Sequence, residues 1–419
     1  MKYKSSINGT VRYTLLNVAY FAAFCTIHAY AAVYLISKGF SNTEVGALLA
    51  VANIVSAIMQ PVIAGIIDKP GFLTNRRFIM IAVMIIMTGS AVLMFAPENK
   101  AVVFFIYALI YMVQFVYQPV MTALCFEYQK AGCNIMFGLA RGLGSASFAV
   151  TSAIIGGIIE KNGVGILLWV NIATMAITVI VMWFFRKPGE MPVSAGGCED
   201  VATGGQIKTS DSYMSDSTEK QQNKSNSLIG FVRAYPAFML FLAAVICFFF
   251  AHNMINDFMI RIVNELGGNE TELGYANFLQ AILELPVMAL IGFVLKKINA
   301  ERLLMISGLA FFIKILILVF AKNMPVMYLS QSFQLFAYAV FVPAGAYYVS
   351  KTMDEFDQVK GQAFITSAIT IGGVFSNLIS GVILDHSGIR AMLITGSAVC
   401  AAGVLIAVIA MTRLPHRAG

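Results

Sequence analysis

Long, nearly uninterrupted apolar runs constrain the fold of this chain more than any other feature of its sequence. Twelve such runs, each about 19 to 29 residues long, alternate with short polar segments. An α-helix needs about 20 apolar residues to cross the hydrocarbon core of a bilayer. Open strands are excluded there because their backbone groups would go unpaired. Only 12% of the 419 residues are charged, too few to cover a water-soluble protein of this length. The sequence therefore predicts an all-α membrane protein.

The twelve runs fall into two sets of six, separated by a polar segment. The predicted spans are residues 13–36, 44–67, 78–96, 101–125, 135–159 and 164–185, followed by 236–264, 272–295, 302–320, 325–349, 362–384 and 390–412. Residues 186–229 are rich in Ser, Thr, Gly, Gln and Asn and show no apolar periodicity, which predicts a disordered linker. We expect a six-helix bundle at residues 1–185, the linker at 186–229, and a second six-helix bundle at 230–419.

The distribution of Lys and Arg predicts the orientation of these spans. Twenty of the 28 basic residues lie on the side of the N-terminus and five on the opposite side, while three fall inside spans. By the positive-inside rule, both termini and the linker are expected to be cytoplasmic, in a plasma or inner membrane. The net charge of +7 reflects this topology, so no nucleic-acid partner is expected.

Two short motifs recur in the two sets of spans. Thr-Glu-Val-Gly at residues 43–46 returns as Thr-Glu-Leu-Gly at 271–274, and the glycine-rich helix end at 156–163 has a counterpart at 381–388. A Ser or an Asn stands three residues before each of the two glutamates, which is the spacing of a helix capping box. The repeats indicate a duplicated six-helix unit, and two like halves suit a transporter that alternates its access around a central site.

Polar residues at helical spacing mark one face of four predicted spans. They are Asn53, Ser56 and Gln60; Tyr111, Gln114 and Gln118; Asn277, Gln280 and Glu284; and Gln331, Gln334 and Tyr338. Such faces either hydrogen-bond neighbouring helices or line a solute pathway, and we favour the pathway. Amides and tyrosines with few charges suit a neutral polyhydroxylated or mixed polar solute.

Charged residues inside the spans are the strongest candidates for function, because a charge in lipid is expensive. Arg141 lies among small residues of the fifth span and predicts a substrate or gating role. Glu284 is expected to carry a coupled proton whose affinity Lys314 sets; mutual neutralisation of the two is the alternative. Asp257 and Arg261, four residues apart, are predicted to form an ordinary surface ion pair.

The histidines and cysteines show no metal-binding or catalytic pattern. His28 and His252 lie at similar depths in corresponding helices, where each could serve the solute, a proton or simple packing. The six cysteines lie mostly in apolar runs without paired spacing. Phosphate-binding loops and zinc-protease motifs are missing from the sequence. We therefore expect no enzyme activity, no cofactor and no metal.

The turn after the second span resembles the signature of the major facilitator superfamily. It contains Gly65, Asp68, Lys69 and Gly71, followed by the basic pair at 76–77. The chain departs from the signature by an Ala at position 64, where the family has its first Gly, and by the late position of the basic pair. The resemblance implies two pseudo-symmetric six-helix bundles. It also implies that Asp68, Arg76 and Arg77 tune a conformational equilibrium.

A second resemblance is to the lactose permease branch, the oligosaccharide:proton symporters. Residues 137–144, Phe-Gly-Leu-Ala-Arg-Gly-Leu-Gly, are similar to a stretch of that family whose last Arg contacts sugar. This implies a sugar contact for Arg141, a stacking position for Phe148 and a basic position at Lys314. Asn253 and Gln334 stand where that family has acidic and proton-handling residues, so its own coupling machinery is not copied.

Glu284 stands in a Glu-x-Pro pattern that resembles one in the aromatic-acid and nucleoside permease groups. The leading prediction is a proton-coupled symporter of a sugar or oligosaccharide that works as a monomer in the lipid bilayer. An importer of an aromatic acid or nucleoside is the alternative. A drug exporter is a third reading, disfavoured because residues 136–159 contain no proline.

Three groups of site residues follow from these arguments. The predicted substrate-binding residues are Arg141, Phe148, Tyr111, Gln114, Gln118, Asn53, Gln60, Asn277, Gln280, Gln334, Tyr338, His28 and Asn253. The predicted proton-coupling residues are Glu284, Lys314 and His252. The predicted conformational switch comprises Asp68, Arg76 and Arg77.

Overall fold

The computed structural model describes residues 2–69, 71–95, 99–187 and 228–412, and every regular element in them is a helix. The first half contains α1 (Lys2–Phe24), the π-helix η1 (Cys25–Ala29), α2 (Ala31–Ser37), α3 (Asn42–Ile67), α4 (Asn75–Phe95), α5 (Lys100–Lys130), α6 (Phe137–Asn162) and α7 (Ile166–Phe184). Nearly all of the predicted linker, together with the C-terminal residues 413–419, lies outside the described residues.

The second half repeats this arrangement after a short entry helix. It contains α9 (Leu228–Ala234), α10 (Pro236–Asp257), α11 (Met259–Glu265), α12 (Glu270–Val294), α13 (Ala300–Val319), α14 (Met324–Ser332), the 3-10 helix η2 (Phe333–Leu335), α15 (Tyr338–Thr352), α16 (Glu355–His386) and α17 (Gly388–Thr412). Within the described chain, ten helical segments are long and apolar enough to span a membrane, and the bent α1–α2 pair makes eleven. With α12, whose 25 residues include three glutamates, the arrangement agrees with twelve predicted spans.

Capping explains where two of the long helices begin. The Ser41 side chain accepts from the backbone of Glu44, whose carboxylate accepts in return from the backbone N–H of Ser41. Asn269 and Glu272 form the same box at the start of α12. Both boxes satisfy amides that a helix N-terminus would otherwise leave unpaired. The predicted capping boxes are confirmed.

Three spans are interrupted part-way, and each interruption carries a candidate residue. The first span changes direction by 49° between η1 and α2, and η1 contains His28. The seventh breaks at Phe258, directly after Asp257. The tenth passes through η2, which contains Gln334. Irregular backbone at membrane depth is tolerated where protein or a polar pathway covers it, so the breaks draw attention to these residues.

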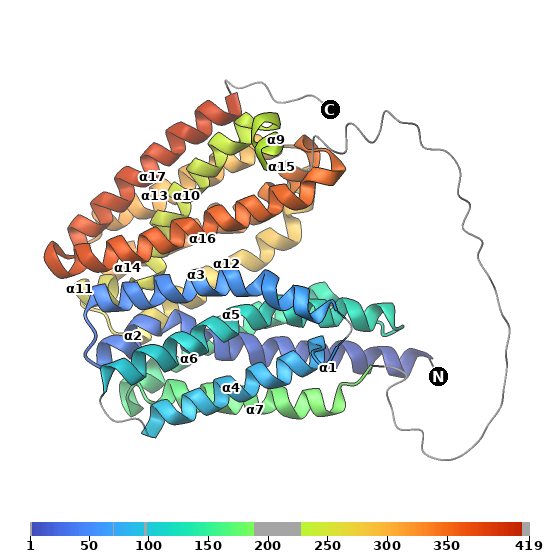
Figure 1. Ribbon diagram of the computed structural model, residues 1–419. Helices are drawn as coiled ribbons and strands as arrows, with labels where there is room; N and C mark the ends of the chain where they lie inside the picture. Colours follow the sequence, from blue (N-terminus) through green and yellow to red (C-terminus); the bar gives the residue numbers. More distant parts are fainter. Residues whose placement is uncertain (1, 70, 96–98, 188–227, 413–419) are drawn as a thin grey trace, which may run out of the picture.

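The two halves meet along two helix pairs. α3 packs against α16, and α6 packs against α12. In Figure 1 the two halves lie against each other at the end where α3 begins, and they diverge toward the opposite end. The start of α1 and the ends of α7 and α17 all lie on that diverging side. The helix pairs therefore cross the interface at one end of the molecule.

Candidate functional site

A chain of hydrogen bonds joins the two candidate coupling residues in the second half. Lys314 is completely buried, and its Nζ donates to Gln334 Oε1 at 2.8 Å and to Gln280 Oε1 at 3.2 Å. Gln334 in turn donates from Nε2 to Glu284 Oε1 at 2.8 Å. The amide of Gln334 therefore stands between the ammonium and the carboxylate, which influence each other through it.

In the first half, Arg141 of α6 is the charged candidate residue, as Lys314 and Glu284 are in the second half. Its Nη1 donates to Ser145 Oγ at 2.7 Å, and its guanidinium lies 4.2 Å from the ring centre of Phe21. No carboxylate within the described residues forms an ion pair with it. Glu284 and Tyr338 of the other half lie within electrostatic reach. Most of the guanidinium donors remain available to a solute.

Aromatic rings surround His28 in the first half. Phe24 stacks on the imidazole at 3.8 Å between ring centres, Tyr111 lies at 3.8 Å, and Phe115 meets it edge-on at 4.5 Å. Both ring nitrogens are buried without a hydrogen-bond partner among the described residues. Phe148 lies 6.5 Å from Phe24 and extends this cluster.

His252 occupies the equivalent position in the second half. Its ring stacks on Tyr338 at 5.4 Å and meets Phe311 edge-on at 5.4 Å. The Nδ2 amide of Asn256 lies 2.9 Å from its Nε2. Each half thus presents a histidine packed on a tyrosine that the sequence analysis placed on a polar face.

The remaining predicted substrate residues divide between the interface and the helix bundles. Gln114 is fully buried and donates to Asn171 Oδ1 at 3.1 Å, so in this state it joins helices within the first half. Gln60 donates to the backbone of Phe115 at 3.4 Å. Asn53 lies beside Tyr111. At least Gln114 therefore hydrogen-bonds a neighbouring helix, which is the alternative to lining a solute pathway.

Three further candidates are partly buried. The Nδ2 of Asn277 is buried without a hydrogen-bond partner in the part of the chain described. Asn253 lies against Gly373 of α16, where a Cβ would come within 2.6 Å of its Nδ2. Gln118 is partly exposed on α5. Asn277 thus keeps unused hydrogen-bonding capacity, as does Gln114, whose Oε1 is also buried without a partner among the described residues.

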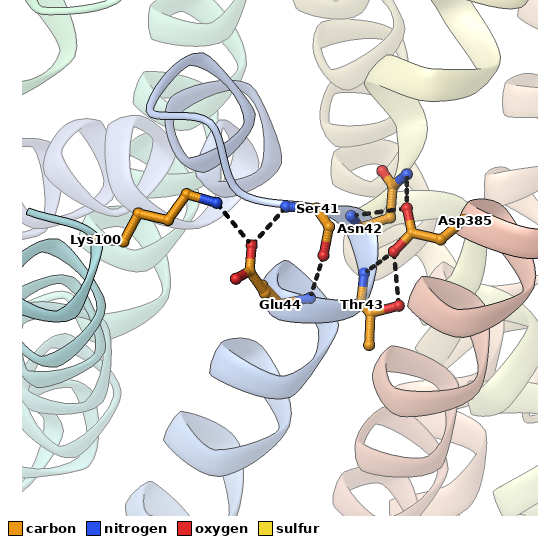
Figure 2. Close-up of polar contacts among 6 residues, drawn as sticks. All are labelled: Ser41, Asn42, Thr43, Glu44, Lys100 and Asp385. Atoms are coloured by element: carbon orange, nitrogen blue, oxygen red, sulfur yellow. Dashed lines mark hydrogen bonds and ion pairs between the residues drawn. The ribbon is translucent and has the colours of Figure 1, made fainter. Parts of the chain in front are cut away.

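The N-terminus of α3 is held by a carboxylate from the other half. Asp385, near the end of α16, accepts four hydrogen bonds, as Figure 2 shows. The donors are the backbone N–H groups of Asn42 at 3.1 Å and Thr43 at 2.7 Å, the Asn42 amide at 2.7 Å, and the Thr43 hydroxyl at 2.6 Å. A carboxylate is favourable there because a helix N-terminus carries partial positive charge and free N–H groups.

The other helix pair repeats this contact in weaker form. Glu160 of α6 accepts one hydrogen bond, from the Thr271 hydroxyl of α12 at 2.7 Å. Glycines allow the backbones to touch in both pairs: a Cβ at Gly46 would overlap the backbone of Asn377, and one at Gly274 would overlap that of Ser152. The two motifs that recur in the sequence therefore meet across the interface. Sequence reasoning found both repeats but missed their pairing, which their nearly equal offsets could have suggested.

Comparisons with known proteins show the family of this chain. Residues 11–395 match the model of the MFS_1 like family. The chain belongs to the MFS_1-like family. Its members are transporters of the major facilitator type, so the chain is a multi-pass membrane transporter. No curated protein matches it.

Solved structures agree with this assignment of fold. A variant of the nucleoside transporter NupG superposes with a TM-score of 0.76 at 14% identity, covering 96% of this chain and 100% of that one. An auto-inhibited POT family peptide transporter gives 0.72 at 12% identity, with 97% of both chains covered. The POT family transporter PepTSo gives 0.72 at 11% identity, with 96% of both covered. These likenesses establish the major facilitator fold of the MFS_1-like chain.

The three residues of the predicted conformational switch, Asp68, Arg76 and Arg77, form no ion pair with one another in this structure. Their role stays a prediction. Asp68 is exposed at the end of α3. Arg76 donates to the backbone carbonyl of Met182 at 2.8 Å, and Arg77 donates to that of Phe72 at 2.7 Å. The structure brings the two arginines together at one cavity, described below, and leaves Asp68 apart from them.

The prediction of a surface ion pair between Asp257 and Arg261 is wrong. The helix breaks at Phe258, so the two residues do not share one helical face. Arg261 donates instead from Nε to Asn42 Oδ1 of the first half at 2.7 Å. Arg261 therefore adds to the contact around the start of α3.

Proposed function

We propose that the chain is a proton-coupled symporter that carries a small polar solute by alternating access between its halves. The observation that supports this most strongly is the linked set Lys314–Gln334–Glu284, which lies within electrostatic reach of Arg141. One carboxylate, one ammonium and one guanidinium are gathered from both halves. A change in the protonation of Glu284 changes the charge opposite Arg141, and that couples proton and solute.

The hydrogen-bond chain allows Glu284 to change its protonation without losing its position. Gln334 donates to Glu284 Oε1, and a carboxylic acid can still accept this bond through its carbonyl oxygen. Lys314 stays satisfied by two amide oxygens in either case, which reduces the cost of its burial. The pair is thus joined through an amide, which distinguishes it from a directly neutralised ion pair.

The surrounding rings support a solute that has a flat face. Tyr111 with His28, and Tyr338 with His252, supply aromatic surface from the two halves. Rings of this kind pack well against the apolar face of a sugar, while Arg141 can donate to its hydroxyls. A sugar or oligosaccharide is therefore the first substrate class we propose.

A nucleoside is the second candidate. The ring of His28 lies among Phe24, Tyr111 and Phe115, and such a stack suits a nucleobase better than a sugar alone. The structural likeness to NupG, a nucleoside transporter, adds to this candidate. Both classes combine hydroxyl groups with a ring that can stack.

A transport assay with an imposed pH gradient tests the proposal. The full-length protein in proteoliposomes is offered radiolabelled sugars, nucleosides and aromatic acids. Glu284→Gln mimics the protonated acid, so it should exchange the accepted solute across the membrane but fail to accumulate it. The exposed Glu265→Gln in the same half is the matched control and should accumulate solute normally. Uphill transport by the double variant Glu284→Gln, Lys314→Met would contradict the assignment of Glu284 as the proton carrier.

A further inference from the structure

A cavity of about 600 Å³ opens beside the ends of four segments on the diverging side of the first half. Its walls come from the loop before α4, the first turns of α4, the end of α5 and the residues after α7. Neither Arg141 nor Glu284 lines it, and the proposed transport chemistry does not use it. It lies on the side that carries 20 of the 28 basic residues.

The cavity is strongly cationic. Arg76, Arg77, Arg186 and Lys187 line it together with one carboxylate, that of Glu127. The four cations and one anion leave a net charge of three positive units. A cavity with this excess favours an anion of more than one negative oxygen.

The carboxylate of Glu127 already accepts hydrogen bonds from two side chains of the protein. Glu127 accepts from Lys187 Nζ at 3.3 Å and from Asn75 Nδ2 at 2.9 Å. Arg77 and Arg186 instead each make one bond to a nearby backbone carbonyl. None of the three arginines has an ion-pair partner among the described residues.

Arg76 gives the cavity an unsatisfied buried donor. Its Nη2 bonds to the carbonyl of Met182, but its Nε is buried without a partner in the part of the chain that is described. Each guanidinium carries five N–H donors in a planar fork that suits a phosphate oxygen pair. Buried donors of this kind are normally paired, so the cavity calls for an acceptor-rich ligand.

Apolar side chains also line the cavity and lie beside it. Met80 and Ile81 of α4 are among the lining residues, and Ile81 is 42% exposed. Phe72 at the rim is 75% exposed, and Trp183, next to the wall, is 62% exposed. Aromatic residues beside basic ones are typical of the headgroup level of a bilayer. A ligand with a phosphate and acyl chains matches both parts of this surface.

We infer that this cavity binds the phosphate headgroup of an anionic phospholipid, with its acyl chains along α4. Basic pockets between membrane helices on the cytoplasmic side bind such headgroups. Free phosphate would satisfy the arginines but would leave Phe72 and Ile81 exposed. The site does not involve the transported solute, so the test of this inference does not depend on whether the proposed function is correct.

Native mass spectrometry of the full-length protein in neutral detergent tests this inference. Phosphatidylglycerol and phosphatidylcholine are titrated in parallel, with and without millimolar inorganic phosphate. Wild type should prefer phosphatidylglycerol, and the double variant Arg77→Gln, Arg186→Gln should bind it about 30-fold more weakly. Inorganic phosphate should displace little of the lipid.

Matched variants distinguish charge recognition from loss of folding. Arg77→Lys with Arg186→Lys keeps both charges and should retain the preference for phosphatidylglycerol. Lys296→Gln with Lys297→Gln removes two exposed charges from the corresponding loop of the second half and should bind like wild type. Equal binding of the two lipids by wild type, an equal loss in the Lys296 and Lys297 variant, or full displacement by inorganic phosphate would overturn the inference.

Discussion

The α3–α16 contact and the α6–α12 contact are built from the same two sequence motifs, but different interactions hold them. In the first, Asp385 accepts four hydrogen bonds from the first turn of α3. In the second, Glu160 accepts one, from Thr271. The close backbone packing at glycine occurs in both.

One aligned position explains much of the difference. Asn42 donates its side-chain amide to Asp385, whereas the equivalent residue at the start of α12 is Glu270. A glutamate cannot donate, and its charge opposes that of Glu160. One of the two contacts is therefore polar, and the other relies mainly on packing. In an alternating-access transporter both must open and close together, so the polar contact is expected to dominate the equilibrium.

Packing at the glycines should produce the largest effect. A Cβ at Gly46 or Gly274 would overlap backbone atoms of the opposite half, which no rotamer change can relieve. Overpacking of this kind costs roughly 1–3 kcal/mol, so Gly46→Val and Gly274→Val should each reduce transport by about tenfold or more. Labelling of a cysteine at Thr43 by a membrane-impermeant reagent reports the opening. Gly292→Val, at a position of α12 with open space, is the control. Unimpaired transport by both variants would show that this end need not close.

Removal of the carboxylates should produce a smaller and unequal effect. Asp385→Ala loses four accepted hydrogen bonds in a partly solvated place, worth about 1–2 kcal/mol together. It should raise the open fraction at this end by about tenfold, while Glu160→Ala should change it by less than about threefold. The distance between spin labels at Lys38 and Arg390 measures both, because neither of these residues donates to Asp385. Equal effects of the two variants would refute the proposed asymmetry.

Exchange of the aligned residues should produce the smallest effect, in opposite directions. Asn42→Glu removes a donor to Asp385 and should open the α3 contact, although it still offers Arg261 an acceptor. Glu270→Asn supplies a donor and removes a repelling charge, so it should tighten the α12 contact. Changes of about twofold to fivefold in the open fraction at each contact are expected from single hydrogen bonds of this strength. The same direction of change in both variants would contradict the explanation.

Much of the fold was accessible from the sequence because it depends on local patterns. Apolar run length predicted the spans, and the Ser41–Glu44 spacing predicted the start of α3. The internal breaks were not predicted. Side chains of other helices donate to the backbone at these breaks, the Tyr107 hydroxyl to Ile27 in η1 and the Ser307 hydroxyl to Ala337 after η2. The apolar pattern carries no sign of such partners.

The candidate site was accessible only in part. Glu284, Lys314 and Gln334 were each selected singly, and the structure joins them in one chain of hydrogen bonds. Spacing along one helix could not separate Gln114, which bonds to Asn171 inside the first half, from residues that face the interface. Asp385 was seen as part of a repeat, but its partners lie 342 and 343 residues away in sequence. Only the folded arrangement of the halves brings them together.

Distances between spin labels at both ends of the interface test the central claim, alternating access held by the α3–α16 contact, most directly. In a cysteine-free background of the reconstituted protein, one label pair replaces Lys38 and Arg390 near this contact, and another replaces Lys69 and Lys297 at the opposite end. Asp385→Ala should lengthen the first distance and shorten the second, in the same population of molecules. Two unchanged distances, or two that lengthen together, would contradict the claim.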